Sequence, residues 1–186
     1  MYKYLYSICL ILLITFSSTP SVANSWNIDF EKSTIEFTGV HAGNDFKGIF
    51  KNWQADIQFD PKNAITSYAE VRIFTGSATT GNALYDGTIK GEDWFDIKSF
   101  PEAVFKSVSF TAQSSTLFEV VGALEIKGKS VPLKFPVSIE MTGNTALATF
   151  EIPLNRLWFD LGVQSDPTAV WVAEEIGVKV RVVANR

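Results

Sequence analysis

Apolar and polar residues alternate with a period of two along most of this chain, which is typical of β-strands that bury one face. The alternating segments are separated by short polar turns and cover residues 26–30, 35–39, 46–50, 53–60, 66–74, 103–110, 118–126, 131–139, 146–152 and 176–182. Hairpin turns are indicated at Lys127-Gly128-Lys129 and Gly143-Asn144. The pattern predicts an all-β, antiparallel barrel of about eight strands, with an upper count near ten.

One long connection interrupts this alternation and carries the most unusual residues. Residues 77–90 contain few apolar side chains and several glycines, so a single short helix over residues 82–90 is expected there. Trp94 and Phe95 follow side by side, and Pro101 ends the connection before the next strand. A long aromatic connection between strands predicts a lid or a plug at one end of the barrel.

The N-terminus is interpreted as a targeting segment. Lys3 is the only charge before Asp29, an apolar run covers residues 5–16, and small residues occur at 21–23. This is the pattern of a secretory signal peptide over residues 1–23, followed by one domain over residues 24–186. An uncleaved anchor is the alternative, although the run is shorter than the roughly 20 residues of a membrane span.

Composition narrows the classes of partner and chemistry. The net charge is −4 and no basic run occurs, so nucleic acid is not an expected partner. The only cysteine, Cys9, lies within the predicted signal peptide, and His41 is the only histidine, which excludes the common zinc constellations. The 15 phenylalanines and five tryptophans are consistent with a packed β-core or with the wall of an apolar channel.

Few polar residues suggest chemistry, and each has a structural alternative. His41 is either a ligand contact at the barrel mouth or a hydrogen-bonded turn residue. Arg156 is either a surface residue, the partner of Asp86, or a contact to an acidic ligand head, with a structural salt bridge favoured. Asp93 and Asp96 resemble a carboxylate pair but are more simply interpreted as a solvated acidic loop.

Several short motifs, in this order, resemble the YceI-like family. They are Asp86-Gly-Thr-Ile-Lys90, Asp93-Trp-Phe-Asp96, Phe100-Pro101, Gly122-Ala-Leu-Glu-Ile-Lys-Gly128 and Glu175-Ile-Gly-Val-Lys-Val180. The resemblance implies an exported, lipocalin-like barrel that holds polyisoprenoids, quinone-type lipids or other long amphiphiles, without catalytic residues or a cofactor. Lys32 and Lys129-Ser130 depart from the commonest family pattern, and the first change bears on the polar mouth.

The resemblance and the alternation together lead to a predicted site. The channel wall is expected on one set of strand faces, comprising Phe37, Phe50, Ile73, Val108, Phe118, Val120, Leu124, Leu133, Phe135 and Phe150. A register slip of one residue would exchange the two faces. Trp94 and Phe95 are expected to close the channel, with His41, Asp86 and Arg156 at its polar mouth.

The resulting hypothesis is a periplasmic carrier for a long-chain isoprenoid or other amphiphilic lipid. Two hypotheses from other classes remain open, namely a ligand-free structural or interaction barrel and an enzyme acting on isoprenoid diphosphates. Transient membrane contact and a homodimer are left open as partner states.

Overall fold

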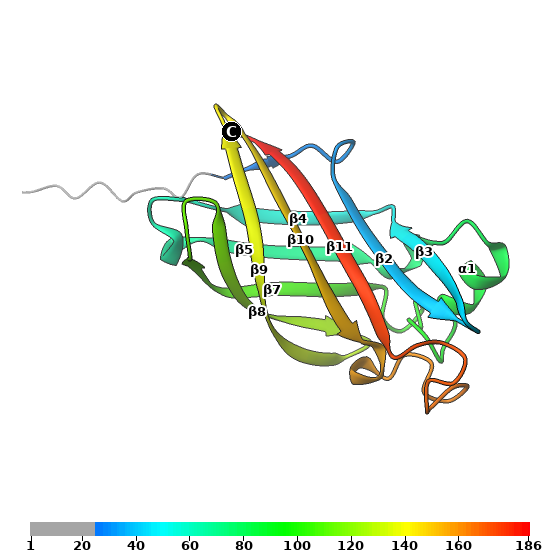
Figure 1. Cartoon of the computed structure of the whole chain (residues 1–186). Helices are drawn as coiled ribbons and strands as arrows, with labels where there is room; N and C mark the ends of the chain where they lie inside the picture. The colour runs from blue at the N-terminus through cyan, green and yellow to red at the C-terminus, as the bar shows by residue number, and fades with distance from the viewer. Residues whose placement is uncertain (1–24) are drawn as a thin grey trace, which may run out of the picture.

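The computed structural model describes residues 25–186, so the predicted signal peptide over residues 1–23 lies outside the described residues. Eleven strands form one sheet that curls around an apolar interior (Figure 1). They are β1 (Asn27–Ile28), β2 (Thr34–His41), β3 (Asn44–Phe50), β4 (Trp53–Gln58), β5 (Tyr68–Phe74), β6 (Ala78–Thr79), β7 (Glu102–Ala112), β8 (Leu117–Ile126), β9 (Lys129–Thr142), β10 (Thr145–Asn155) and β11 (Glu175–Asn185).

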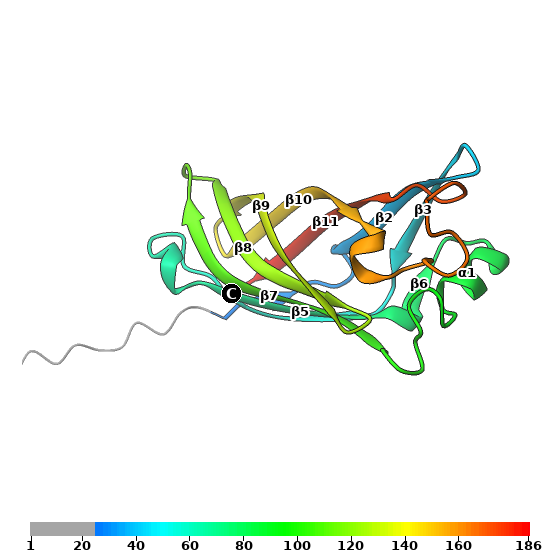
Figure 2. The ribbon, with the colours of Figure 1, turned by 90° about the horizontal axis from the view of Figure 1, so that it is seen from below.

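The sheet follows the order β4-β5-β7-β8-β9-β10-β11-β2-β3-β6, with every pairing antiparallel. Two layers result, in which β9, β10, β11, β2 and β3 cross over β4, β5, β7 and β8 (Figures 1 and 2). Strand β9 forms the corner, since its first part pairs with β8 and its last residues pair with β10. The predicted all-β antiparallel barrel is therefore confirmed.

A short N-terminal segment ties the two layers together at the end opposite the helix. Strand β1 pairs with β11, and Ser25 forms an isolated bridge with Gln58 of β4. The indole nitrogen of Trp26 donates a hydrogen bond of 3.0 Å to the carbonyl oxygen of Phe59. The strand count exceeds the prediction because β6 has only two residues, too few to show an alternation, whereas β1 lies within the segment predicted over residues 26–30.

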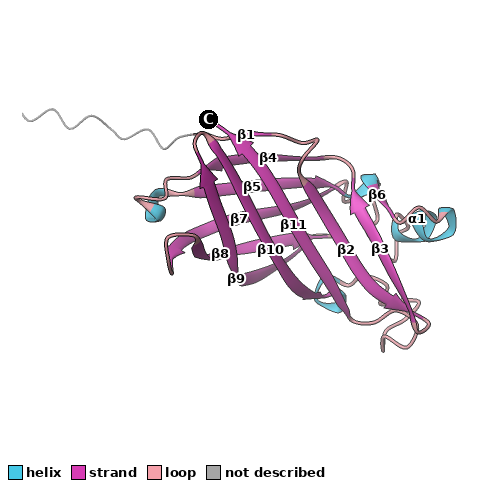
Figure 3. Ribbon diagram, turned by 45° about the horizontal axis from the view of Figure 1, so that its top comes forward, coloured by secondary structure: helices cyan, strands magenta, loops and turns pink. Residues whose placement is uncertain are grey.

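The predicted helix is present as α1 (Ala83–Ile89), at the far end of the barrel from β1 (Figure 3). Its N-cap is Asn82, whose side-chain oxygen accepts hydrogen bonds from the backbone nitrogens of Leu84 and Tyr85. This cap satisfies two amide groups that have no partner within the helix. Three 3-10 helices complete the fold: η1 (Ala64–Thr66), η2 (Thr75–Ser77) and η3 (Arg156–Phe159).

A β-bulge in β7 overturns one predicted wall residue. Ser107 is opposite Gly122 and Ser109 is opposite Val121, so Val108 is the extra residue and is 78% exposed. Before the bulge Phe105 faces the interior, and after it Phe110 does, because one inserted residue exchanges the faces of a strand. The placement of Val108 on the channel wall is wrong for this reason.

Glycines on the inner face make room for phenylalanine rings of neighbouring strands. A Cβ built on Gly122 would lie 2.5 Å from both the carbonyl oxygen of Lys106 and the ring of Phe105. A Cβ built on Gly48 would likewise collide with the ring of Phe37, its register partner on β2. The missing side chains let large rings lie flat on the sheet and fill the interior.

We predict that Gly122→Ala destabilises the protein by about 1–3 kcal/mol, because the added methyl group meets backbone that cannot rotate away. The matched control is Gly87→Ala in α1, where a Cβ would meet nothing within 4 Å. That change should stabilise by about 0.5–1 kcal/mol, since alanine loses less backbone entropy. The free energy of unfolding from urea titration checks both, and equal effects would refute the packing argument.

Candidate functional site

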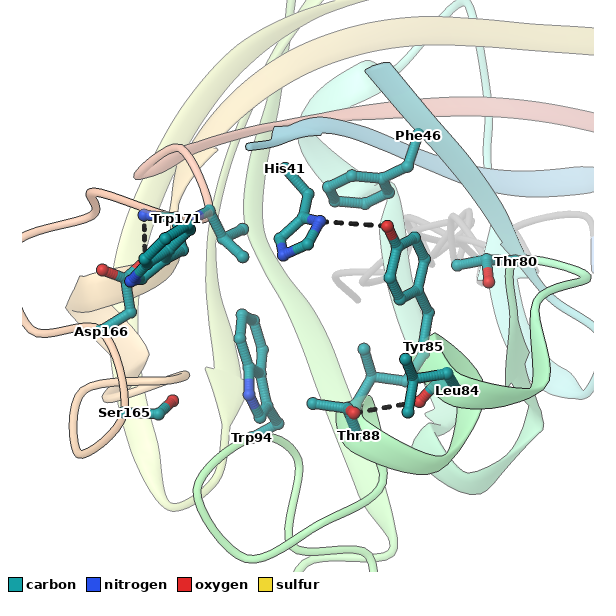
Figure 4. Close-up of a pocket in the computed structure, with 12 residues that line it drawn as sticks. His41, Phe46, Thr80, Leu84, Tyr85, Thr88, Trp94, Ser165, Asp166 and Trp171 are labelled. Carbon is teal, nitrogen blue, oxygen red and sulfur yellow. Dashed lines mark hydrogen bonds between the residues drawn. The ribbon is translucent and has the colours of Figure 1, made fainter. Parts of the chain in front are cut away.

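A pocket of about 340 Å³ lies at the α1 end of the barrel (Figure 4). We call it the mouth pocket. It is mostly apolar and aromatic with a few polar groups, and its lining comprises His41, Phe46, Thr80, Leu84, Tyr85, Thr88, Ile89, Trp94, Ser165, Asp166, Trp171 and Val172. Leu84 and Trp171 are 73% and 61% exposed, so apolar surface remains in contact with water at the rim.

Three parts of the chain meet to form the mouth pocket. The end of β2 is joined to the loop before β11 by hydrogen bonds from Ala42 to Trp171 (2.7 Å) and from Ala173 to Val40 (2.9 Å). Helix α1 closes the opposite side, and Trp94 rises between them in Figure 4. Backbone pairing therefore fixes His41 and Trp171 on the same rim.

The polar centre of the pocket is a pair of side chains from different elements. Nδ1 of His41, the last residue of β2, lies 3.0 Å from the hydroxyl oxygen of Tyr85 in α1. Their rings meet edge to face, with centroids 5.2 Å apart. His41 therefore lies at the mouth, as predicted. Its hydrogen bond is made across the pocket to Tyr85 and not within a turn.

Trp94 and Phe95 lie between the mouth pocket and the core. Both pack against the main core cluster, and Trp94 also lines the mouth pocket. The Trp94 ring is held from behind by Gly162 and by the guanidinium of Arg156, whose carbon lies 5.4 Å from the ring centroid. Phe95 meets the ring of Phe50 with centroids 5.9 Å apart. This geometry fits a fixed plug better than a swinging lid.

Arg156 is buried beneath the mouth pocket and does not line it. Its side chain is fully inaccessible to solvent and forms a salt bridge of 2.9 Å with Asp166. Other guanidinium N–H groups donate to the carbonyl oxygens of Leu161 and Val172. The predicted structural salt bridge is present, but the predicted partner Asp86 is wrong and Asp166 takes its place.

The environment of this pair keeps both groups charged. Hydrogen bonds from the backbone nitrogens of Val172, Val170 and Trp171 lower the pKa of Asp166 and outweigh the effect of its burial. Burial lowers the pKa of Arg156, while the adjacent Asp166 carboxylate opposes that change. An arginine stays protonated under such conditions. The pair therefore presents no net charge to the mouth pocket.

Asp86 is also a structural residue. It lies in α1 and accepts hydrogen bonds from the Thr79 hydroxyl (2.6 Å), the Thr80 backbone nitrogen (2.6 Å) and the Thr80 hydroxyl (2.8 Å). These bonds lower the pKa of Asp86 to about 2. Its carboxylate holds the end of β6 against α1, so the predicted place of Asp86 in the polar mouth is wrong.

Asp93 joins the plug to the loop that follows η3. Its carboxylate accepts hydrogen bonds from the backbone nitrogens of Gln164 (2.8 Å) and Ser165 (2.9 Å) and from the Ser165 hydroxyl. Burial raises the pKa of Asp93, but these hydrogen bonds outweigh it and the pKa lies below its ordinary value. Asp93 is thus anchored to this loop and is not a freely solvated acid.

A second cavity, of about 170 Å³, lies inside the barrel and is lined only by apolar residues. Six of the predicted wall residues line it: Ile73, Val120, Leu124, Leu133, Phe135 and Phe150. Phe118 is buried in the core against Phe59, and Phe37 and Phe50 pack on one another near the plug. Strands β4 and β11 contribute lining residues that the prediction did not name, including Trp53, Ala55, Val178 and Val180.

The sequence did not indicate several residues of the mouth pocket. Tyr85, Leu84 and Thr88 share one predicted short helix, and their spacing could have indicated one face. Trp171 and Asp166 lie in an irregular loop without periodicity, so no local pattern identifies them. Within residues 25–186, no cluster of potential metal ligands is found, and none of the helices is both long and apolar enough to span a membrane.

A curled antiparallel sheet around an apolar cavity, with a separate mouth pocket at one end, defines a lipocalin-like β-barrel. The chain belongs to the YceI-like domain family, whose model matches residues 26–184. The family resemblance of the sequence motifs is thereby confirmed.

Three similar proteins illustrate this relation. A UPF0312 protein of Yersinia pestis (strain Pestoides F) is 28% identical over 134 residues, which cover 70% of this chain and 69% of that protein. The crystal structure of Burkholderia cenocepacia BcnA matches with a TM-score of 0.81 and 29% identity, over 84% of this chain and 99% of that one. A Saccharophagus degradans domain, described as polyisoprenoid binding, has a TM-score of 0.67 and 13% identity, over 86% and 97% of the two chains.

We predict that Arg156→Met destabilises the protein by about 3–5 kcal/mol, because it leaves the buried Asp166 carboxylate without its partner. The control is Arg72→Met, which removes a 44% exposed guanidinium from surface salt bridges with Glu70 and Glu102. That loss should be small, because an exposed ion pair gains little in water and is screened by salt. Urea unfolding measures both free energies, and a small loss for Arg156→Met would contradict the role assigned to the pair.

The lowered pKa of Asp86 also leads us to predict how the stability of the fold depends on pH. Because the folded-state pKa is about 2 against an ordinary value of 3.8, the carboxylate stabilises the fold above pH 3.8 and loses this effect as the pH falls towards 2. Asp86→Asn should therefore melt at a lower temperature than the wild type near neutral pH. The difference in melting temperature should shrink between pH 3.8 and 2; a constant difference would argue against the linkage.

Proposed function

We propose that this protein binds a long isoprenoid or quinone-type lipid in the barrel and acts as its carrier in the periplasm. The observation that carries the proposal is the internal cavity, whose 23 lining residues are all apolar. Burial of an apolar chain gains roughly 25 cal/mol for each Å² removed from water. Such a wall can bind a hydrocarbon tail without any specific polar contact.

The mouth pocket and the plug suggest how such a lipid is accommodated. The tail would occupy the inner cavity and the head the mouth pocket, with Trp94 and Phe95 between them. At 170 Å³ the inner cavity is smaller than the about 300–1,000 Å³ of typical ligand pockets. Loading therefore requires the plug or the inner rings, such as Phe135 and Phe150, to change rotamer and enlarge the channel.

Three further observations support the proposal of a periplasmic lipid carrier. The chain belongs to the YceI-like family, and a structure with the same fold is described as a polyisoprenoid binding domain. The periplasmic location rests on the signal-peptide pattern of residues 1–23. Binding without catalysis is favoured because Asp166 in the mouth pocket, and Arg156 and Asp93 near it, are engaged in internal contacts.

The direct test is native mass spectrometry of the protein purified from the periplasm of its source, followed by extraction and identification of any bound lipid. A long-chain isoprenoid or quinone in stoichiometric amount is the expected result. A clean mass of the unliganded chain, together with failure to bind added prenyl lipids, would instead favour the ligand-free barrel.

We predict that Ala148→Trp lowers affinity for prenyl lipids at least about tenfold, because the indole fills the cavity that Ala148 lines. Ala112→Trp, at the exposed end of β7, is the matched control and should bind like the wild type. Circular dichroism and thermal unfolding establish that each variant folds. Ala55→Trp, on β4, repeats the test should Ala148→Trp be unstable. Unchanged affinity in a folded variant of this kind would reject the inner cavity as the lipid site.

A further inference from the structure

The mouth pocket offers no cation to a ligand. Among its described lining residues none is lysine or arginine. The nearest guanidinium, Arg156, has no solvent-accessible side-chain surface and donates to Asp166 and to backbone carbonyl groups. Asp166 lines the pocket, and its buried carboxylate is already paired with that guanidinium. A phosphate or carboxylate placed here would lose water without gaining a counter-charge, which is strongly unfavourable.

The pocket does offer one directed polar group. Figure 4 shows His41 pointing into the pocket between Phe46 and Trp94, with Nδ1 turned to Tyr85. Within the described residues, no hydrogen-bond partner is found for the other ring nitrogen, Nε2. Its side chain is half-buried, so a ligand in the pocket would displace the water that Nε2 otherwise binds.

The contact with Tyr85 is the basis for assigning which nitrogen of His41 carries the proton. In neutral imidazole one nitrogen donates and the other accepts. The Tyr85 hydroxyl needs an acceptor, and Nδ1 of His41 is the only one it meets among the described residues. We assign the Tyr85 hydroxyl as the donor to Nδ1, and with this assignment Nε2 carries the hydrogen. The free group facing the pocket is thus an N–H donor, which requires an acceptor oxygen on the ligand.

We propose that the mouth pocket selects an uncharged, carbonyl-bearing head group, whose oxygen accepts a hydrogen bond from Nε2–H of His41. Tyr85 is a positioning residue that sets the tautomer. The aromatic rings of Phe46, Trp94 and Trp171 supply the apolar surround for this head. The inference rests on the proposed function and decides between lipid classes that share a prenyl tail: carbonyl compounds are accepted, and prenyl phosphates are rejected.

Three probes with one tail and different heads test this selection. Geranylgeranylacetone carries a ketone, geranylgeraniol a hydroxyl group and geranylgeranyl phosphate a charged phosphate. Because Trp94 and Trp171 line the pocket, tryptophan fluorescence reports binding at concentrations below micelle formation. Wild-type protein should bind the ketone roughly tenfold more tightly than the phosphate, since nothing in the pocket compensates the buried charge.

Variants separate head recognition from general affinity. His41→Phe keeps the ring and removes Nε2–H, so ketone affinity should fall about threefold to tenfold, as for one hydrogen bond, with phosphate affinity unchanged. Tyr85→Phe frees the tautomer and should reduce the ketone preference by less. Leu84→Ala trims the apolar rim and should weaken all three probes by the same factor, leaving their ratios intact.

The outcomes are distinct for the two proposals. Equal or tighter binding of the phosphate to the wild type, or an equal loss for all three probes in His41→Phe, would overturn the carbonyl selection while leaving lipid binding in place. Failure of every probe to bind the folded wild type would refute both the proposed carrier function and the proposed selection of carbonyl head groups. Ketone preference in the wild type that is lost in His41→Phe supports both.

Discussion

The buried ion pair of Arg156 and Asp166 organises the end of the barrel at which a ligand would be received. Arg156 reaches from η3 to the loop before β11 and donates to carbonyl groups at Leu161 and Val172. Asp166 in turn accepts from the backbone nitrogens of residues 170, 171 and 172. Two charges removed from water are costly unless every donor and acceptor is satisfied. Here each buried nitrogen and oxygen of the pair has a hydrogen-bond partner, and these bonds hold an irregular loop in one shape.

The same guanidinium supports the plug, so the mouth and the interior are mechanically connected. Trp94 lies between Arg156 and the mouth pocket, and Asp93 beside it is hydrogen-bonded to residues 164 and 165. A movement of the plug would therefore disturb the loop that carries Trp171, and a ligand in the mouth would contact both. Side-chain rotation within a fixed backbone is the simplest way to enlarge the channel, because the backbone of this region is held by several hydrogen bonds.

The interior shows how an aromatic-rich chain leaves space inside a narrow barrel. Phenylalanine rings lie over glycines of adjacent strands, as Phe37 does over Gly48 and Phe105 over Gly122. Of these two rings, Phe105 borders the apolar inner cavity, whereas Phe37 packs against Phe50 near the plug. Composition left open whether the phenylalanines form a packed core or the wall of a channel. Both occur, since some rings form a packed core and others line a cavity.

The sequence by itself determined the helix and every strand of the described residues except β6, because a period of two and the spacing of apolar residues and glycines are local properties. It also placed six of the residues that line the inner cavity, including Leu133 and Phe135, by alternation. Tertiary structure decided the rest. The bulge that turns Val108 outward depends on how β7 pairs with β8, and no local pattern reveals it. The partner of Arg156 and the contact of His41 with Tyr85 join residues far apart in the chain, where many polar groups could have met. Local periodicity fixes which face of a strand is apolar, whereas only the curled sheet determines which polar groups meet.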